Sequence, residues 1–98
     1  MPSVRVFDGL AIKVEDTVRQ NPEIITIGIS TNGRGYTLRH EKNEVISTQR
    51  GRFKATVSHS EVLTFLKHHR PPHYNLTDPN YADDGKWYFS LIPDKSLE

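Results

Sequence analysis

Residues 24–29 read Ile-Ile-Thr-Ile-Gly-Ile. β-branched side chains are enriched in strands because they fit a pleated, packed surface, so their density here predicts a buried central strand. Residues 32–35, Asn-Gly-Arg-Gly, follow almost at once. Asparagine and glycine tolerate positive φ, which predicts a turn, and residues 36–40 are then expected to return as a second strand.

The chain continues in the same manner beyond residue 40. Two more strands are predicted at 45–49 and 52–57, with Arg50-Gly51 as the connection between them. Residues 24–57 are therefore expected to form an antiparallel meander with tight connections.

A helix start follows the meander at Ser58. Ser58 and Glu61 have the spacing of a capping box, and Val57 and Val62 occupy the positions of a hydrophobic staple. The helix is expected to end at Pro71-Pro72, since proline cannot continue it.

A polar stretch and an aromatic strand complete the sequence. Residues 71–85 are predicted to be a long loop that serves either as a functional lid or as a mobile connection. Residues 86–92 are predicted to be the last strand, with Trp87, Phe89 and Leu91 on one face and Tyr88 with Ser90 on the other.

The N-terminal part leaves two alternatives open. Residues 3–7 suit a short strand, after which Asp8-Gly9 either turns a hairpin or begins a helix. We favour the helix, with Asp8 as its N-cap and Glu15 facing Arg19, because apolar residues share one face. These are Leu10, Ala11, Val14 and Val18.

Together these patterns predict an α+β domain: an antiparallel sheet of about four to six strands with two helices packed on one face. The expected order is strand, helix, four strands, helix, strand. Residues 1–96 form the predicted single domain, and Leu97-Glu98 resemble residues contributed by an expression vector.

The composition narrows the cellular context. The chain of 98 residues has no cysteine, which excludes disulfides and thiolate metal sites and fits a reducing compartment. It shows neither a signal-peptide run nor 18 consecutive apolar residues. We therefore interpret it as a cytoplasmic protein that does not enter membranes.

Charge is distributed unevenly. Residues 34–73 hold eight Lys or Arg and only three Glu, and all five histidines also lie in this stretch. Both ends of the chain are acidic, so the net charge of the whole chain is only +1. Such asymmetry concerns partners rather than fold.

Strand alternation would place several of these cations on the outward face of the meander, with arginines in the adjoining turns. Cations that follow phosphates, together with a ring such as Tyr88 that stacks on bases, are the features of proteins that bind single-stranded nucleic acid. The simpler interpretation is a solvated sheet surface. The candidate nucleic-acid-binding residues, for DNA or RNA, are Arg34, Arg39, Arg50, Arg52, Lys54 and, at the rim, Arg70.

The alternative is a protein-interaction module. The 71–85 loop concentrates prolines and tyrosines, and Tyr74, Leu76 and Tyr81 would be its anchors for another protein or for a second copy of the chain.

Catalysis and metal binding find little support. Neighbouring histidines such as His68-His69 do not share a helix face, and the acidic loop at Asp83-Asp84 lacks EF-hand spacing. No nucleophile elbow, phosphate-binding loop or HExxH motif occurs. We expect no cofactor, no metal and no catalytic residue, with a dyad of His68 or His69 and Asp83 or Asp84 as the only enzymatic alternative.

Overall fold

The computed structural model describes residues 5–94. Within this range the elements are, in chain order, α1 (Asp8–Val18), β1 (Ile24–Ile29), β2 (Gly35–Lys42), β3 (Val45–Arg52), α2 (His59–His68), β4 (Tyr74–Leu76), β5 (Asn80–Tyr81) and β6 (Trp87–Pro93). The strands form one antiparallel sheet, so the predicted α+β class is confirmed.

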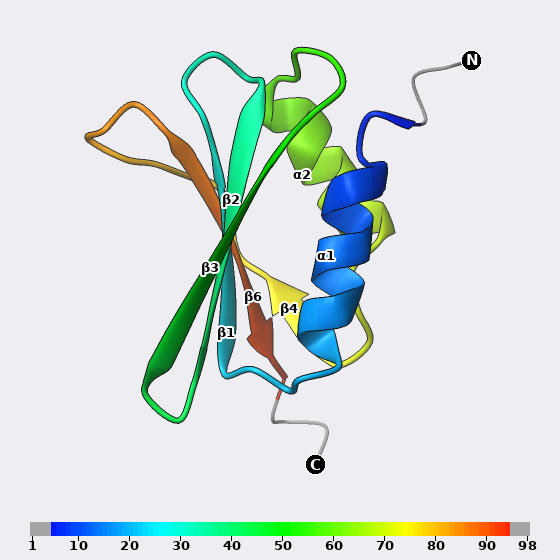
Figure 1. Ribbon diagram of the computed structural model, residues 1–98, viewed down its shortest axis with the longest axis vertical. Helices are drawn as coiled ribbons and strands as arrows, with labels where there is room; N and C mark the ends of the chain where they lie inside the picture. Colours follow the sequence, from blue (N-terminus) through cyan, green and yellow to red (C-terminus); the bar gives the residue numbers. More distant parts are fainter. Residues whose placement is uncertain (1–4, 95–98) are drawn as a thin grey trace.

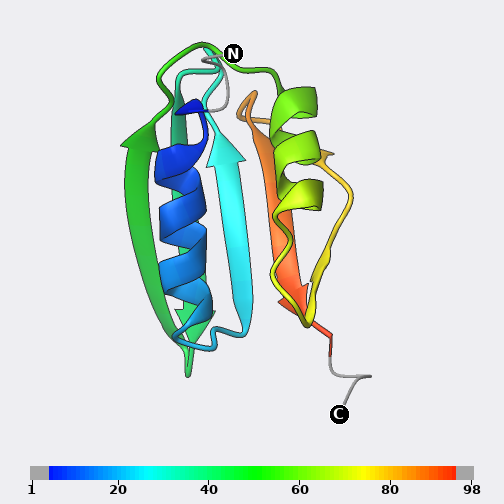
Figure 2. The same cartoon turned by 90° about the vertical axis from the view of Figure 1, so that its right-hand side faces the viewer.

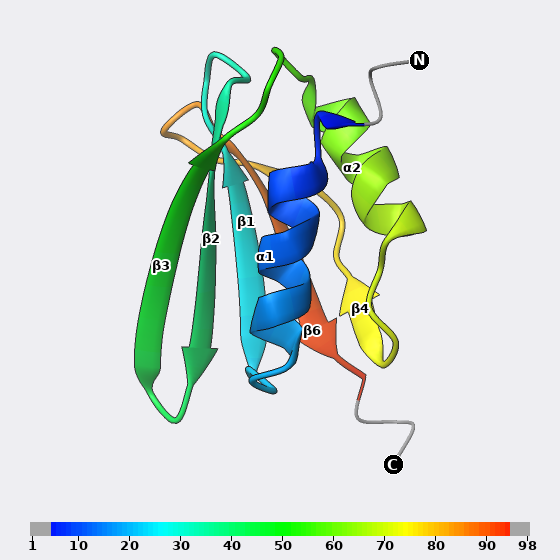
Figure 3. The ribbon, with the colours of Figure 1, turned by 45° about the vertical axis from the view of Figure 1, so that its right-hand side comes forward.

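The sheet has β1 near its middle. The strand order is β3-β2-β1-β6-β4, and the short β5 also pairs with β6. The Ile-rich stretch thus has a neighbour on each side, β2 and β6, as expected of a buried central strand (Figure 3). Both β3 and β4 are edge strands.

Both helices lie on the same side of the sheet (Figure 1). In Figure 2, α1 lies in front of β2, between β3 and β1, while α2 lies over β6. Ile25, Ile27 and Ile29 are buried, as are Phe89 and Leu91 on β6. Alternate residues therefore point to the helices, and the intervening ones point to the opposite side. We call that second side the uncovered face.

The first helix is confirmed, although its start differs from the prediction. Asp8 is its first residue rather than its N-cap, which is Phe7 and makes no side-chain cap. Residues 5–7 form a short 3₁₀ segment and turn instead of a strand, and the rest of the predicted strand, with Leu97-Glu98, lies outside the described residues. Asp8 lies 3.9 Å from Arg5 and complements the positive end of the helix.

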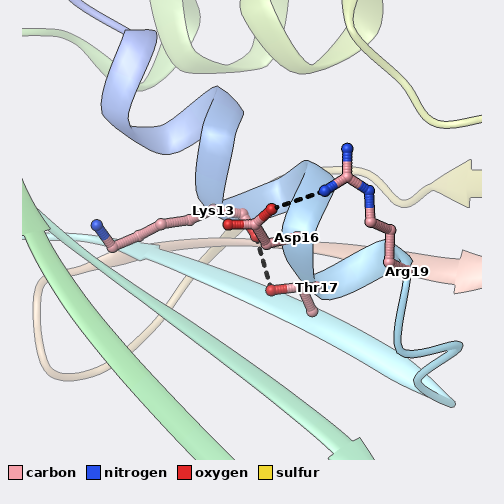
Figure 4. A network of polar contacts seen from close by, with 4 residues as sticks. All are labelled: Lys13, Asp16, Thr17 and Arg19. Atoms are coloured by element: carbon pink, nitrogen blue, oxygen red, sulfur yellow. Dashed lines mark hydrogen bonds and ion pairs between the residues drawn. The ribbon is translucent and has the colours of Figure 1, made fainter.

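The end of α1 is held by local polar contacts (Figure 4). Thr17 is fully buried, and its hydroxyl donates a hydrogen bond of 2.7 Å to the carbonyl of Lys13. Arg19 donates to Asp16 at 3.2 Å rather than to the predicted Glu15. Asn21, at φ 54°, then turns the chain towards β1.

The meander has one strand fewer than predicted. β3 runs without interruption through Arg50-Gly51 to Arg52, and residues 53–58 form an irregular connection to α2. The cause is the pairing of Gly51 with Tyr36, because any Cβ at Gly51 would overlap the Tyr36 ring. This glycine makes room for a cross-strand aromatic and does not form a turn.

The 71–85 loop contains two short strands that sequence patterns miss. β4 and β5 pair with opposite ends of β6, so the segment is anchored at two places. The capping box that begins α2 is confirmed, with Ser58 and Glu61 bonded to each other in both directions. Neither helix within residues 5–94 has the length and apolar character needed to cross a membrane.

Candidate nucleic-acid interface

The uncovered face gathers cations from two strands, β2 and β3, and from the turn before β6. Cross-strand register places Arg50 beside Thr37 and Arg52 beside Gly35. Arg39 is paired with Thr48, which makes it a diagonal neighbour of Arg50. Because Leu38 and Tyr36 are buried under the helices, these alternate residues face away from the core.

Two adjoining hollows lie on this face. The first, the arginine hollow, has a volume of about 430 Å³ and is lined by Arg50, Arg52, Lys86 and Ser30, among others. It contains no carboxylate. The second, the tyrosine hollow, has a volume of about 660 Å³ and is lined by residues of β1, β2, β3 and β6 together with Thr77, Asp78, Asn80 and Ala82. Thr37 belongs to both, so the two hollows form one continuous surface.

A rigid turn forms one side of the arginine hollow. The Ser30 hydroxyl donates to the Asn32 side chain at 2.7 Å and accepts from the backbone N–H of Gly35 at 2.9 Å. Gly33 adopts φ 72°, as the predicted turn requires. The turn at Gly85 approaches Thr31, which brings Lys86 to the same end of the sheet.

Tyr88 lies across the middle of the uncovered face. It is paired with Gly28, where an added Cβ would come within 2.8 Å of the Tyr88 ring. Its hydroxyl donates a hydrogen bond of 2.7 Å to Asp84. The ring therefore covers the glycine, and its hydroxyl is fixed by Asp84 in the turn that precedes β6.

The Tyr88–Asp84 contact changes the ionisation of both groups. The hydrogen bond from Tyr88 lowers the pKa of Asp84, helped by the backbone N–H of Lys86. The same hydrogen bond raises the pKa of Tyr88, while nearby Arg39 acts in the opposite direction. Arg39 and Tyr88 are therefore close enough to influence one another.

The cations of this face are not neutralised by ion pairs. Within residues 5–94 the ion pairs are Arg5–Asp8 and Arg19–Asp16, both on the helical side. Arg39, Arg50 and Arg52 are exposed, and no described carboxylate lies within 4.0 Å of their guanidinium nitrogens. Their positive charges are available to an anionic partner.

The remaining candidates lie outside this group. Arg34 is exposed in the turn before β2, next to the arginine hollow, while Lys54 is exposed in the connection after β3. Arg70 lies on the helical side, where its guanidinium donates to the carbonyl of Tyr74 at 2.6 Å. The structure thus groups Arg39, Arg50 and Arg52 and separates Arg70 from them.

Lys86 is a member of the face that sequence reasoning did not select. Its position contained the necessary signal, since period-two alternation places residues 86, 88 and 90 on one side of the last strand. Ser30 left no such signal, because its role depends on the fold of the turn around Asn32.

The three loop anchors differ in exposure. Tyr74 is buried, and its hydroxyl donates to the carbonyl of Pro22 at 3.4 Å. Leu76 is half-buried. Tyr81 alone is largely exposed, at 62%, with its ring 5.0 Å from that of Trp87, which also stacks on His59.

The histidines and the acidic loop are not brought together. His69 stacks on Phe65 within the helical layer, whereas Asp84 is bound to Tyr88 on the uncovered face. No group of three or more His, Asp or Glu side chains within residues 5–94 is arranged to hold a metal ion.

Comparison of the chain with family models, with curated proteins and with solved structures finds no match.

Proposed function

We propose that this protein is a non-enzymatic nucleic-acid-binding protein that holds a single strand across the uncovered face of its sheet. One observation carries the proposal: exposed guanidinium groups from β2 and β3, without an ion-pair partner in residues 5–94, border two adjoining hollows on the sheet surface that neither α1 nor α2 covers.

The arginine hollow has the chemistry of a phosphate site. Arginine forks donate two parallel hydrogen bonds to phosphate oxygens, and lysine adds a point charge. Arg50 and Arg52 project from the same side of β3, and Lys86 lines the hollow with them. No carboxylate belongs to its lining, and Lys86 also interacts electrostatically with Asp84 in the neighbouring turn.

The tyrosine hollow suits a base. Tyr88 supplies a ring held in place at both ends, over Gly28 and at Asp84. Aromatic rings bind bases of any sequence because every base has a π-face. Hydroxyl groups of Thr26, Thr48 and others line the same hollow and can bond to base edges. A strand whose phosphates lie in one hollow would place its bases in the next.

The test is a titration with mixed-sequence single-stranded and duplex oligonucleotides at low salt. We expect preferential binding of the single strand and a steep decrease in affinity as salt rises, because counterions are released from the phosphates. The double variant Arg50→Ala/Arg52→Ala should bind more weakly and lower the salt slope by about 1–2.

The matched control removes two cations from the helical side. Arg19→Ala/Lys67→Ala carries the same change in net charge, and its binding should stay close to that of the wild type. Equal losses in both double variants, or no binding by the wild-type chain at low salt, would refute the proposal.

Two substitutions at Tyr88 distinguish the contribution of base stacking to binding from that of the cations. Tyr88→Phe keeps the ring over Gly28, whereas Tyr88→Leu covers the glycine without a π-face. The leucine variant should lose about 1–3 kcal/mol of binding free energy, the usual contribution of base stacking, with an unchanged salt slope.

A further inference from the structure

The two edge strands of the sheet, β3 and β4, differ in length and in flanking proline residues. At one edge, β4 has three residues and follows a proline pair at residues 71–72. At the other, β3 is an eight-residue strand without proline, and its register with β2 continues without a bulge. Short strands, proline, bulges and charged side chains are the usual protection of an edge. β4 is protected by the first two, whereas β3 is open except for the charges of Arg50 and Arg52 at one end.

The open edge has a defined set of free backbone groups. A two-residue turn joins Lys42 to Val45, so that these two residues bond to each other and odd-numbered residues of β3 face β2. The hydrogen bond of 2.8 Å from Phe53 N–H to the Arg34 carbonyl continues this series. Ile46, Thr48 and Arg50 therefore direct their N–H and C=O groups away from the sheet.

Apolar side chains at this edge are exposed. Val45 is 63% exposed and Ile46 57%, and they lie on opposite faces of β3. An exposed strand of this length, with unpaired backbone groups and apolar residues, is a template for another strand.

We propose that β3 pairs antiparallel with β3 of a second copy of this chain, around a two-fold axis at Gln49. Free backbone groups of both copies must meet, which restricts pairing to even-numbered residues opposite even-numbered residues. Centring at Gln49 places Thr48 opposite Arg50 of the second copy and Ile46 opposite Arg52.

Charge selects this orientation. Arg50 and Arg52 both lie at the same end of β3, so a parallel arrangement would bring like charges together. The antiparallel arrangement sets each arginine opposite a neutral residue. Arg50 and its symmetry mate remain diagonal neighbours, and their mutual repulsion should make the dimer tighter as salt rises.

The dimer would combine two uncovered faces into one. A two-fold axis normal to the sheet keeps equivalent faces on the same side, so Arg39, Arg50 and Arg52 of both copies would form a continuous basic surface. Self-association does not depend on the proposed nucleic-acid binding, and their salt dependences have opposite signs.

The first experiment is sedimentation equilibrium without nucleic acid, from micromolar to millimolar protein. The apparent mass should rise from 11.3 kDa towards twice that value. Thr48→Pro removes an outward N–H without removing a bond to β2, and by symmetry it removes two hydrogen bonds from the dimer. It should weaken association about tenfold or more, whereas Thr48→Val, which keeps the N–H, should associate like the wild type.

A second experiment tests the register and does not depend on the folding of the proline variant. The chain has no cysteine, so Gln49→Cys introduces a single thiol at the proposed axis. Opposed residues there would lie about 4.5 Å apart between Cα atoms, close enough for a disulfide. Gln49→Cys should form a covalent dimer under mild oxidation much faster than Ser47→Cys, which would face Gly51 of the second copy.

Two outcomes would overturn the inference: a wild-type mass of 11.3 kDa at every concentration, or disulfide formation no faster at position 49 than at 47. Neither result affects nucleic-acid binding by the monomer, which the titration with Arg50→Ala/Arg52→Ala tests separately.

Discussion

At the scale of single residues, two glycine–tyrosine pairs shape the two faces of the sheet. Gly51 accommodates the Tyr36 ring under α1, and Gly28 accommodates the Tyr88 ring on the uncovered face. A ring that packs over a strand glycine compensates for the missing side chain and fixes the register. The same arrangement thus supports the core on one side and the candidate base platform on the other.

Gly28→Ala tests the Tyr88 platform. The new methyl group would come within 2.8 Å of the ring and 3.0 Å of the Thr37 hydroxyl, so Tyr88 must move. We expect a loss of about 1–3 kcal/mol in unfolding free energy, as for other overpacked sites, measured by urea denaturation. Gly35→Ala is the control, because its Cβ would meet nothing closer than 3.6 Å. Equal effects at both positions would contradict the close packing of Tyr88.

The hydrogen bond between Tyr88 and Asp84 predicts a pH dependence. Asp84 raises the pKa of Tyr88, so Asp84→Asn should return that pKa towards about 10, the ordinary value of tyrosine. NMR titration of the Tyr88 ring measures the change, and Asp83→Asn should leave it where it is in the wild type. An unchanged pKa of Tyr88 in Asp84→Asn would show that the hydrogen bond does not form in solution.

The stability effects of this pair occur at opposite ends of the pH scale. The pKa of Asp84 is lowered in the fold, so its contribution is present above about pH 4 and is lost as pH falls through the lowered value. The pKa of Tyr88 is raised, so its contribution is complete below about pH 10 and is lost as pH rises through the raised value. Urea denaturation at several pH values should show both losses in the wild type. Tyr88→Phe should remove the alkaline loss and reduce the acid loss, because the backbone N–H of Lys86 still lowers the pKa of Asp84.

At the scale of elements, α2 depends on its N-terminal cap. The Ser58 hydroxyl accepts from the Glu61 N–H at 3.2 Å, and the Glu61 carboxylate accepts from the Ser58 N–H at 2.8 Å. Ser58→Ala should lower the unfolding free energy by about 1 kcal/mol, measured by denaturation. Ser60→Ala, in the first turn of the same helix, should change it much less, and equal losses would argue against the capping box.

The elements that sequence patterns predicted correctly have local causes. The capping box at Ser58, the turn at Gly33 and the β-branched run of residues 24–29 each specify their own backbone. The prediction of a turn at Arg50-Gly51 was wrong because the ring that fills the space beside Gly51 comes from Tyr36, fifteen positions earlier. β4 and β5 were missed because short strands form only where β6 offers them partners.

At the scale of the whole molecule, the period-two alternation of side chains could predict candidate site residues only within the strands. Period two placed Arg39 and Arg52 on the outward face correctly, and it would have added Lys86. Arg70 could not be placed in this way, because the path of the chain after α2 depends on contacts such as that with Tyr74. Three-dimensional grouping of cations is a property of topology, which the charge of a segment does not specify.

If a nucleic acid binds the basic uncovered face, it should also change the thermal stability of the whole domain. A ligand that binds only the folded state stabilises it, by about 2.7 kcal/mol at one hundred times its Kd. For a domain of this size each kcal/mol corresponds to about 4–8 °C in Tm, so a saturating single-stranded oligonucleotide at low salt should raise Tm by roughly 10 °C or more.

Differential scanning calorimetry with the two double variants locates the source of that stabilisation. Arg50→Ala/Arg52→Ala should lose most of the increase in Tm, because the proposed phosphate contacts are removed, whereas Arg19→Ala/Lys67→Ala should retain it. An increase of the same size in both would mean that the oligonucleotide responds to net charge and not to the uncovered face. Since both variants remove the same formal charge, a difference between them can arise only from where the cations lie on the folded chain.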